Sequence, residues 1–174
     1  MLNWKVLTFE ECSKNQLYDF LRLRNCVFIV EQKSSYIDLD NWDQKAIHFL
    51  GYEYNTLVAY SRLLPPGLKS NEAILSRVCS APTHRHCGVG LQMLKLRLDY
   101  LKQFYPDCIA RTSLQAHRQA LYESVGFTAI SKRYLDIERD IWHIDMAINL
   151  STTTPNFSKI ENPFVIKLSE KIVL

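Results

Sequence analysis

The stretch that decides the fold is residues 74–90, which read ILSRVCSAPTHRHCGVG. Its first half is mostly apolar and predicts a strand over 73–80, which Pro82 ends because proline cannot continue a ladder. Its second half leads into a stripe of leucines, Leu91, Leu94, Leu98 and Leu101, which predicts a helix over 88–104. The loop Arg85-His86-Cys87-Gly88-Val89-Gly90 therefore stands at a helix start.

A helix start is a natural site for an anion, because it carries free N–H groups and the positive end of the helix dipole. Glycines let a bulky ligand approach the backbone closely, and Arg85 adds a full positive charge. A nucleotide-triphosphate loop requires Gly-Lys-Ser/Thr, whereas Leu91-Gln92 follow Gly90 here. A dinucleotide site requires three spaced glycines, and this loop has two. Taken alone, the loop is equally compatible with a plain tight turn.

The patterns outside this stretch predict the order β α β β β α β α β β in one α/β domain. Ser13 and Gln16 have the spacing of a capping box, which begins a helix that runs to about Val30. Strands are expected over 4–9, 46–54, 56–64, 108–114, 127–134 and 141–149, a short helix over 116–124, and a long polar loop over 31–45. We expect the domain to span residues 1–150, with 151–174 as a C-terminal extension of uncertain structure.

The composition limits the class of protein. A hydrophobic fraction of 47% supplies a core, and a net charge of +3 is too small to indicate nucleic acid. The five cysteines include no C-x-x-C pair, so we expect no disulfide framework and no metal site, with Cys26, Cys79 and Cys108 as core residues. No signal-peptide pattern and no apolar run of roughly 18 residues is visible, and we expect a cytoplasmic protein without a membrane partner.

A second motif lies downstream, where residues 120–127 read ALYESVGF. With the pattern R-x-x-G-x-G at 85–90, it resembles the GNAT superfamily of N-acetyltransferases, whose motifs are Q/R-x-x-G-x-G/A and L-Y-x-x-x-G-F. The resemblance implies a mixed, mostly antiparallel sheet of about seven strands with helices on both faces. It also implies acetyl-CoA as cosubstrate, with its pyrophosphate on the loop amides and its pantetheine arm along the preceding strand.

A closer resemblance, to the ElaA-like branch of that superfamily, covers nearly residues 4–148. It rests on five strings: LRLR at 21–24, VFIVEQ at 27–32, AYSRLLPPG at 59–67, SRV at 76–78 and QAH at 115–117. The chain departs from the superfamily pattern at Cys79-Ser80-Ala81, where valines are usual, and at His86-Cys87. Neither departure removes a backbone donor.

The resemblance assigns roles to particular residues. Tyr122 is expected to protonate the coenzyme sulfur, against the alternative of an ordinary core tyrosine. Gln115 stands where the family often has an asparagine that touches the coenzyme. The coenzyme contacts are then expected from Val78, Cys79, Ser80, Arg85, His86, Cys87, Gly88, Val89, Gly90, Leu91, Gln115 and Tyr122.

The general base is left open among Glu31, His48, His117 and His143, with a chain of waters as a further alternative. Arginines in apolar runs are either partners of loop carboxylates such as Asp38 and Asp40 or solvated side chains with buried stems; they are Arg22, Arg24, Arg62 and Arg77. The acidic residues of the 31–45 loop, Asp38, Asp40 and Asp43, are candidates to attract a cationic acceptor.

Three functions are compatible with these residues. The first is transfer of an acetyl group to a primary amine of a small molecule or a peptide. The second is a non-catalytic acyl-CoA-binding sensor or interaction module. The third, nucleic-acid binding, has only the basic and aromatic run Lys132-Arg133-Tyr134 in its favour. Exposed sheet edges and the apolar tail also suggest a homodimer.

Overall fold

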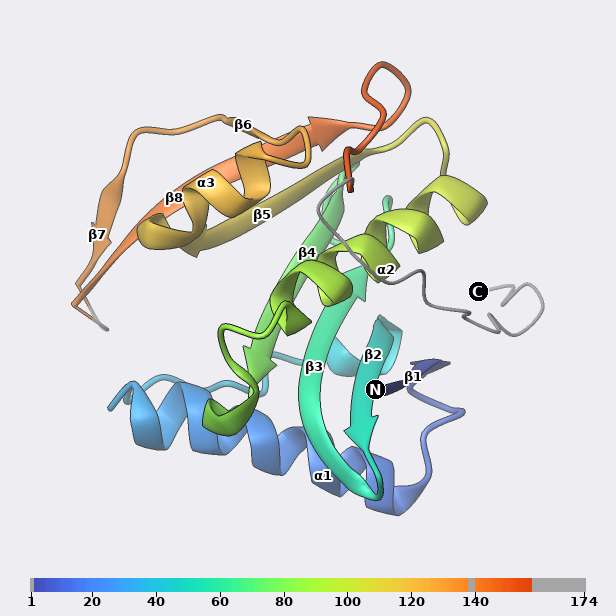
Figure 1. Ribbon diagram of the computed structural model, residues 1–174, viewed down its shortest axis with the longest axis vertical. Helices are drawn as coiled ribbons and strands as arrows, with labels where there is room; N and C mark the ends of the chain where they lie inside the picture. The colour runs from blue at the N-terminus through green and yellow to red at the C-terminus, as the bar shows by residue number, and fades with distance from the viewer. Residues whose placement is uncertain (1, 138–139, 158–174) are drawn as a thin grey trace.

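The computed structural model describes residues 2–137 and 140–157, and one mixed sheet runs through them (Figure 1). Its strands are β1 (Asn3–Thr8), β2 (Ile47–Glu53), β3 (Thr56–Leu64), β4 (Ala73–Ser80), β5 (Ile109–Gln115), β6 (Thr128–Ala129), β7 (Tyr134–Asp136) and β8 (Ile141–Asn149). They lie in the order β1-β2-β3-β4-β5-β8-β6, and β7 also pairs with β8. Among the strands of these described residues, only β4 and β5 pair in parallel.

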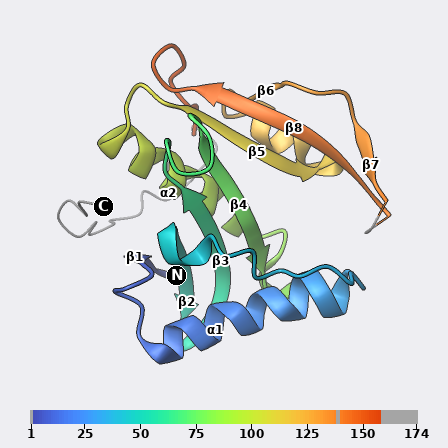
Figure 2. The ribbon, with the colours of Figure 1, turned by 180° about the vertical axis from the view of Figure 1, so that it is seen from behind.

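The helices cover both faces of this sheet, as expected. The helix α1 (Lys14–Arg24) lies on the face seen in Figure 2, while α2 (Val89–Phe104) and α3 (Gln119–Glu123) lie on the face seen in Figure 1. Short 3-10 turns occupy Asp43–Lys45, Pro82–His84 and Ala116–Arg118. The predicted fold class is confirmed, and the predicted order of elements is confirmed as far as α3.

The start of α1 follows from its first residues. The Ser13 hydroxyl accepts a hydrogen bond from the Gln16 amide at 3.2 Å, and the Gln16 side chain accepts one from the Ser13 amide at 2.8 Å. These bonds satisfy two amides that a helix start otherwise leaves free. Beyond Arg24 the chain keeps a helical path as a π-helix, Asn25–Glu31, which ends within one residue of the predicted end.

Two hydrophobic clusters fill the two sides of the sheet. The larger cluster packs α2 and α3 against the strands and includes Leu94, Leu98, Tyr122 and Phe127. The smaller lies under α1, where the Phe20 and Tyr60 rings stack with their centroids 4.8 Å apart. Both faces of the central strands are therefore buried, so β2 and β3 read as nearly continuous apolar runs.

The parallel pair β4–β5 is the irregular part of the sheet. It is paired only at Ala73–Ala110 and Ile74–Arg111, and from there the two strands diverge (Figure 1). On its other side, β4 carries a β-bulge in which Arg77 and Val78 oppose the single residue Ser61. Arg77 has a φ of 53°, in the left-handed region that few residues other than glycine adopt. Nothing in the sequence pattern predicted this bulge.

Two details differ from the sequence predictions. The strand expected over 127–134 is replaced by β6 and β7, two short segments that each pair with β8, so the sheet has eight strands instead of about seven. All five cysteines are free, but Cys26, predicted in the core, is exposed, and Cys108 is only partly buried. Beyond Leu150, residues 151–157 are described, and Phe157 packs on the larger cluster; the apolar stretch Phe164–Leu174 lies outside the described residues.

Candidate active site

The loop before α2 has the geometry of an anion cradle. His86 and Gly88 are both left-handed, with φ of 59° and 82°, and Gly88 is the N-cap of α2. The first amide of the helix with a backbone acceptor is that of Gln92, which donates to the Gly88 carbonyl at 3.0 Å, so the amides of Val89, Gly90 and Leu91 face outward at the helix start. A Cβ built at Gly88 or Gly90 meets nothing within 4 Å, so open space lies over both glycines.

Arg85 and Glu31 form a bidentate ion pair beside this loop. The Arg85 Nη1 and Nη2 atoms each lie 2.7 Å from a Glu31 oxygen, and Nη2 also donates to the Ser80 carbonyl at 3.3 Å. The hydrogen bonds from Arg85 hold the pKa of the Glu31 carboxyl below its ordinary value. Glu31 is thus ionised with both oxygens occupied, which argues against it as a free general base. It ties the end of the π-helix to the loop.

The remaining coenzyme candidates on the strands differ in accessibility. Val78 is half-buried against Val89 and Met93, and Ser80 pairs with Ala59 of β3. Cys79 is buried on the α1 side, and burial raises the pKa of its thiol to about 12, so the thiol is inert at neutral pH. Gln115 stands half-buried at the end of β5, opposite His143 of β8.

Tyr122 lies where α2 and α3 approach each other. Its side chain is 5% exposed, its ring meets Phe127 edge-on at 5.2 Å, and the Arg97 Nη2 atom reaches its hydroxyl at 3.5 Å. This contact joins α2 to α3 on the face of the sheet that the two helices cover (Figure 1). The structure thus puts a phenol hydroxyl between these helices, on one face of the sheet in which β4 and β5 diverge.

The three histidine candidates occupy different environments. His48 is 0% exposed, and its ring accepts from the Tyr60 hydroxyl at 2.8 Å and donates to the Asp43 carbonyl at 3.0 Å. Burial lowers the pKa of His48 to about 4. An amine cannot reach this ring, so the structure contradicts His48 as a base. His117 is exposed in the turn before α3, where slight burial and Arg118 lower its pKa.

His143 is 7% exposed, and its contacts indicate which ring nitrogen carries the hydrogen when the ring is neutral. Its Nδ1 atom lies 3.0 Å from the Ile141 carbonyl, which can only accept, so Nδ1 carries the hydrogen and Nε2 keeps a lone pair. Residues paired across antiparallel strands point to the same face, and Gln115 pairs with His143. The neighbouring pair, Leu114 and Ile144, belongs to the core on the α3 side. His143 therefore faces away from α3.

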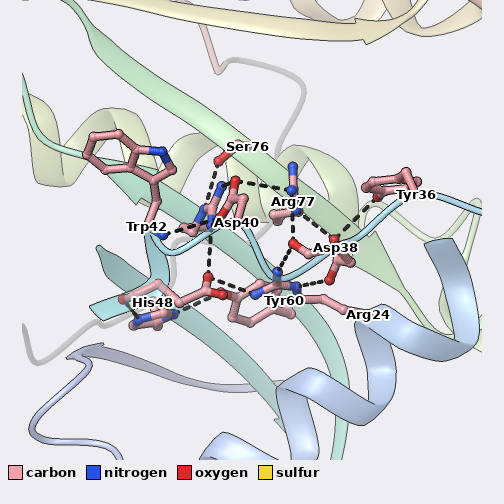
Figure 3. Close-up of polar contacts among 11 residues, drawn as sticks. Arg24, Tyr36, Asp38, Asp40, Trp42, His48, Tyr60, Ser76 and Arg77 are labelled. Carbon is pink, nitrogen blue, oxygen red and sulfur yellow. Dashed lines mark hydrogen bonds and ion pairs between the residues drawn. The ribbon is translucent and has the colours of Figure 1, made fainter. Parts of the chain in front are cut away.

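Six charged side chains tie the 31–45 loop to the sheet (Figure 3). Arg24 binds Asp38 and Asp43 at 2.7 and 2.8 Å. Arg62 binds Asp40 at 2.6 Å and Asp43 at 2.9 Å. Arg77 binds Asp38 at 2.7 Å and Asp40 at 3.1 Å. The predicted pairing of arginines with loop carboxylates is confirmed for these three, whereas Arg22 is exposed.

The charges of this network balance, because three guanidinium groups bind three carboxylates. Burial alone would raise the pKa of Asp40, but the hydrogen bonds and charges of Arg62 and Arg77 outweigh it and hold that pKa far below its usual range. The carboxylates are thus neutralised by their partners. The structure contradicts the expectation that Asp38, Asp40 and Asp43 offer free negative charge to a cationic acceptor.

Among the described residues, no group of three potential metal ligands comes together. No helix in the described part of the chain is long and apolar enough to cross a membrane. A cleft of about 440 Å³ lies beside the loop, between the end of α1 and the β2–β3 turn, and Glu31 and His84 line it. Sequence reasoning missed Arg97, although a cation within the leucine stripe of α2 was a visible signal.

The fold and this loop together define a class of protein. The model of the acetyltransferase (GNAT) family matches residues 17–127, and the chain belongs to that family. The family's acyl-transfer chemistry uses an acyl-CoA, and the outward amides and open space over Gly88 and Gly90 fit such a group.

The chain is also similar to individual proteins over most of their length. The chain is 36% identical to the protein ElaA of Escherichia coli over 149 residues, which are 84% of this chain and 96% of ElaA. The crystal structure of E. coli ElaA superposes with a TM-score of 0.79, covering 84% of this chain and 99% of that one. An acyl-CoA N-acyltransferase from Pseudomonas aeruginosa has the same TM-score at 34% identity, with the same coverage of both chains.

The shared position of Asp43 between Arg24 and Arg62 leads to a prediction for stability. Asp43→Ala leaves two buried guanidinium groups short of a partner, so we expect the free energy of unfolding to fall by about 3–5 kcal/mol. Urea titration measures the free energy of unfolding of each variant. Asp99→Ala, which removes a half-exposed partner of Lys95, is the control and is expected to lose no more than about 0.5 kcal/mol. Equal losses in the two variants would contradict the prediction.

The burial of His48 predicts a pH dependence. Its folded pKa of about 4 lies below the unfolded value of 6.5, so the unfolded chain gains a proton first as the pH falls. Stability is then lost from about pH 6.5 down to pH 4, and His48 accounts for about 2 kcal/mol of loss between pH 7 and pH 5. His48→Gln should flatten this slope in denaturant titrations at the two pH values, whereas His117→Gln should leave most of it. An unchanged slope in His48→Gln refutes the assignment.

Proposed function

We propose that this protein transfers an acetyl group from acetyl-CoA to a primary amine by direct attack, with Tyr122 as general acid and His143 as general base. The observation that carries the proposal is the arrangement around the β4–β5 gap. β4 parts from β5 beyond Ile74 and leads through a short loop to the outward amides at the start of α2. The Tyr122 hydroxyl lies between α2 and α3 on one face of the sheet, and His143 lies on the other face.

The diverging strands support a path for the pantetheine arm. Buried backbone N–H and C=O groups require hydrogen-bond partners, and beyond Ile74 the edge of β4 that faces β5 has none from that strand. An extended, amide-containing chain fits such an edge in the manner of an added strand. Its diphosphate end then meets the amides of Val89, Gly90 and Leu91.

The chemistry requires an acid and a base on different sides of the thioester. An amine with a pKa near 10.4 must lose a proton, which costs about 4–5 kcal/mol at pH 7, and a positioned base reduces that barrier. His143 lies on the face away from α3, whereas Tyr122 belongs to the core on the α3 side. The amine nitrogen bonds to the acyl carbon as the carbon–sulfur bond breaks. His143 Nε2 accepts the proton of the amine, and Tyr122 gives its proton to the sulfur.

The face of β5 and β8 that carries His143 also supports an acceptor site. Polar groups line it: the Ser113 and Tyr134 hydroxyls lie 2.7 Å apart, and the Tyr134 hydroxyl donates to Asp145 at 3.0 Å. The Tyr134 ring stacks on His143 with centroids 6.1 Å apart. We place the acceptor, a small-molecule or peptide amine, over this face.

The diphosphate assignment predicts how substitutions at Gly90 act. Open space surrounds the position of its Cβ, so the free protein should tolerate a side chain there, with an unchanged or higher melting temperature. In Gly90→Leu, the side chain occupies the space of the diphosphate, and we expect calorimetric titration to show acetyl-CoA binding weakened at least about 100-fold. Gly90→Ala, which the family pattern allows, is the size control and should bind within a few-fold of the parent. Parent-like binding in Gly90→Leu would place the diphosphate elsewhere.

The catalytic assignment is tested by coenzyme-thiol release with a panel of amines. Tyr122→Phe and His143→Gln should each lower kcat by about 100- to 10,000-fold and leave the Kd for acetyl-CoA within a few-fold of the parent value. Parent-like turnover in either variant removes that residue from the mechanism. If the parent chain binds acetyl-CoA but releases no thiol with any amine, the non-catalytic sensor is the better reading.

A further inference from the structure

Arg97 is a buried cation without an anionic partner among residues 2–137 and 140–157. It projects from the middle of α2 into the core and is 0% exposed. Its Nε donates to the Met93 carbonyl at 3.1 Å, and its Nη2 donates to the Tyr122 hydroxyl at 3.5 Å. Its Nη1 is buried without a hydrogen-bond partner. In the part of the chain that the structure describes, no carboxylate forms an ion pair with Arg97.

This arrangement is unfavourable for stability. Taking a guanidinium out of water costs several kcal/mol unless a carboxylate compensates. The three arginines across the sheet are each compensated by two aspartates. A leucine or methionine would complete the apolar stripe of α2 at lower cost. Since its charge stabilises nothing that the structure contains, Arg97 is best explained by what it does to its one side-chain partner.

The hydrogen-bond donors and acceptors of Arg97 and Tyr122 determine which way the tyrosine hydrogen points. A guanidinium only donates, so the Tyr122 oxygen must accept from Arg97. A phenol has one hydrogen, and this contact leaves it free to donate to a third group. The two helices thereby orient the hydroxyl with its hydrogen pointing away from Arg97.

We propose that Arg97 is a positioning residue that orients the Tyr122 hydroxyl toward the leaving sulfur and stabilises the phenolate left when its proton has gone. The inference rests on the proposed function, because it assumes that Tyr122 is the general acid. As the carbon–sulfur bond breaks, the sulfur keeps the bonding electrons and takes the Tyr122 proton. The phenolate pairs with the Arg97 guanidinium until solvent returns a proton, which balances the proton that His143 releases.

A double-mutant cycle tests this role. In the parent chain, Arg97→Met should lower kcat by about 10- to 100-fold, the usual effect of losing a hydrogen bond to a charged group, and leave the Kd for acetyl-CoA within a few-fold. In the Tyr122→Phe background the same change should alter kcat less than about twofold, because the hydroxyl on which Arg97 acts is absent. Lys102→Met, at a half-buried cation in the last turn of the same helix, is the control and should leave kcat unchanged.

A measurement without ligand separates this role from a structural one. Methionine fills much of the volume of arginine and removes the uncompensated charge, so Arg97→Met should raise the melting temperature by a few degrees, about 2–4 °C per kcal/mol gained. Higher stability together with slower turnover supports the proposal.

Two results would overturn the inference: an equal fall in kcat in both backgrounds, or a melting temperature several degrees lower in Arg97→Met. The proposed function fails separately, if Tyr122→Phe alone turns over like the parent chain. If Tyr122→Phe is slow but Arg97→Met still lowers kcat in the Tyr122→Phe background, only the role of Arg97 is refuted.

Discussion

The parting of β4 from β5 after two paired residues is the constraint on which the rest of the structure depends. A parallel pair that opens in this way leaves backbone groups without the neighbour that a closed sheet would supply. In the proposed site, the elements around the gap each contribute one part: α2 contributes amides, α3 a hydroxyl, and β8 an imidazole. Had the pair stayed closed, these groups would lie on separate faces of a continuous sheet with no passage between them.

Two kinds of buried arginine hold this arrangement in place. On the α1 side, Arg24, Arg62 and Arg77 are compensated by the loop aspartates, and the network fixes both the 31–45 loop and the bulge of β4 at Arg77. Such a closed network resists change, because removing one partner leaves an unpaired buried charge. On the α3 side, Arg97 has no carboxylate partner among the described residues and contacts Tyr122, the proposed general acid. In this account, the first set of buried charges has a structural use and Arg97 has a functional one.

The sequence predicted those features that depend on local pattern. The capping box at Ser13, the helix after Gly88 and the strand that ends at Ser80 follow from spacing alone. Cys26 was predicted in the core from its apolar neighbours, but the buried residues Phe20, Arg24 and Val27 recur at steps of four and three, and Cys26 lies off that face. The burial of His48 depends on Phe20 and Tyr60, which reach it from α1 and β3. Partners that distant in the chain leave no local signal, and the same is true of the bulge at Arg77 and of the contact between Arg97 and Tyr122.

The central claim is that the helix start after Gly88 and the hydroxyl of Tyr122 act on one ligand that lies between β4 and β5. A crystal structure of the protein with acetyl-CoA tests it most directly. The account predicts the diphosphate on the amides of Val89, Gly90 and Leu91, the pantetheine along β4, and the sulfur within hydrogen-bonding reach of the Tyr122 hydroxyl. A coenzyme bound with its diphosphate away from those amides, or with its sulfur beyond reach of Tyr122, would contradict it.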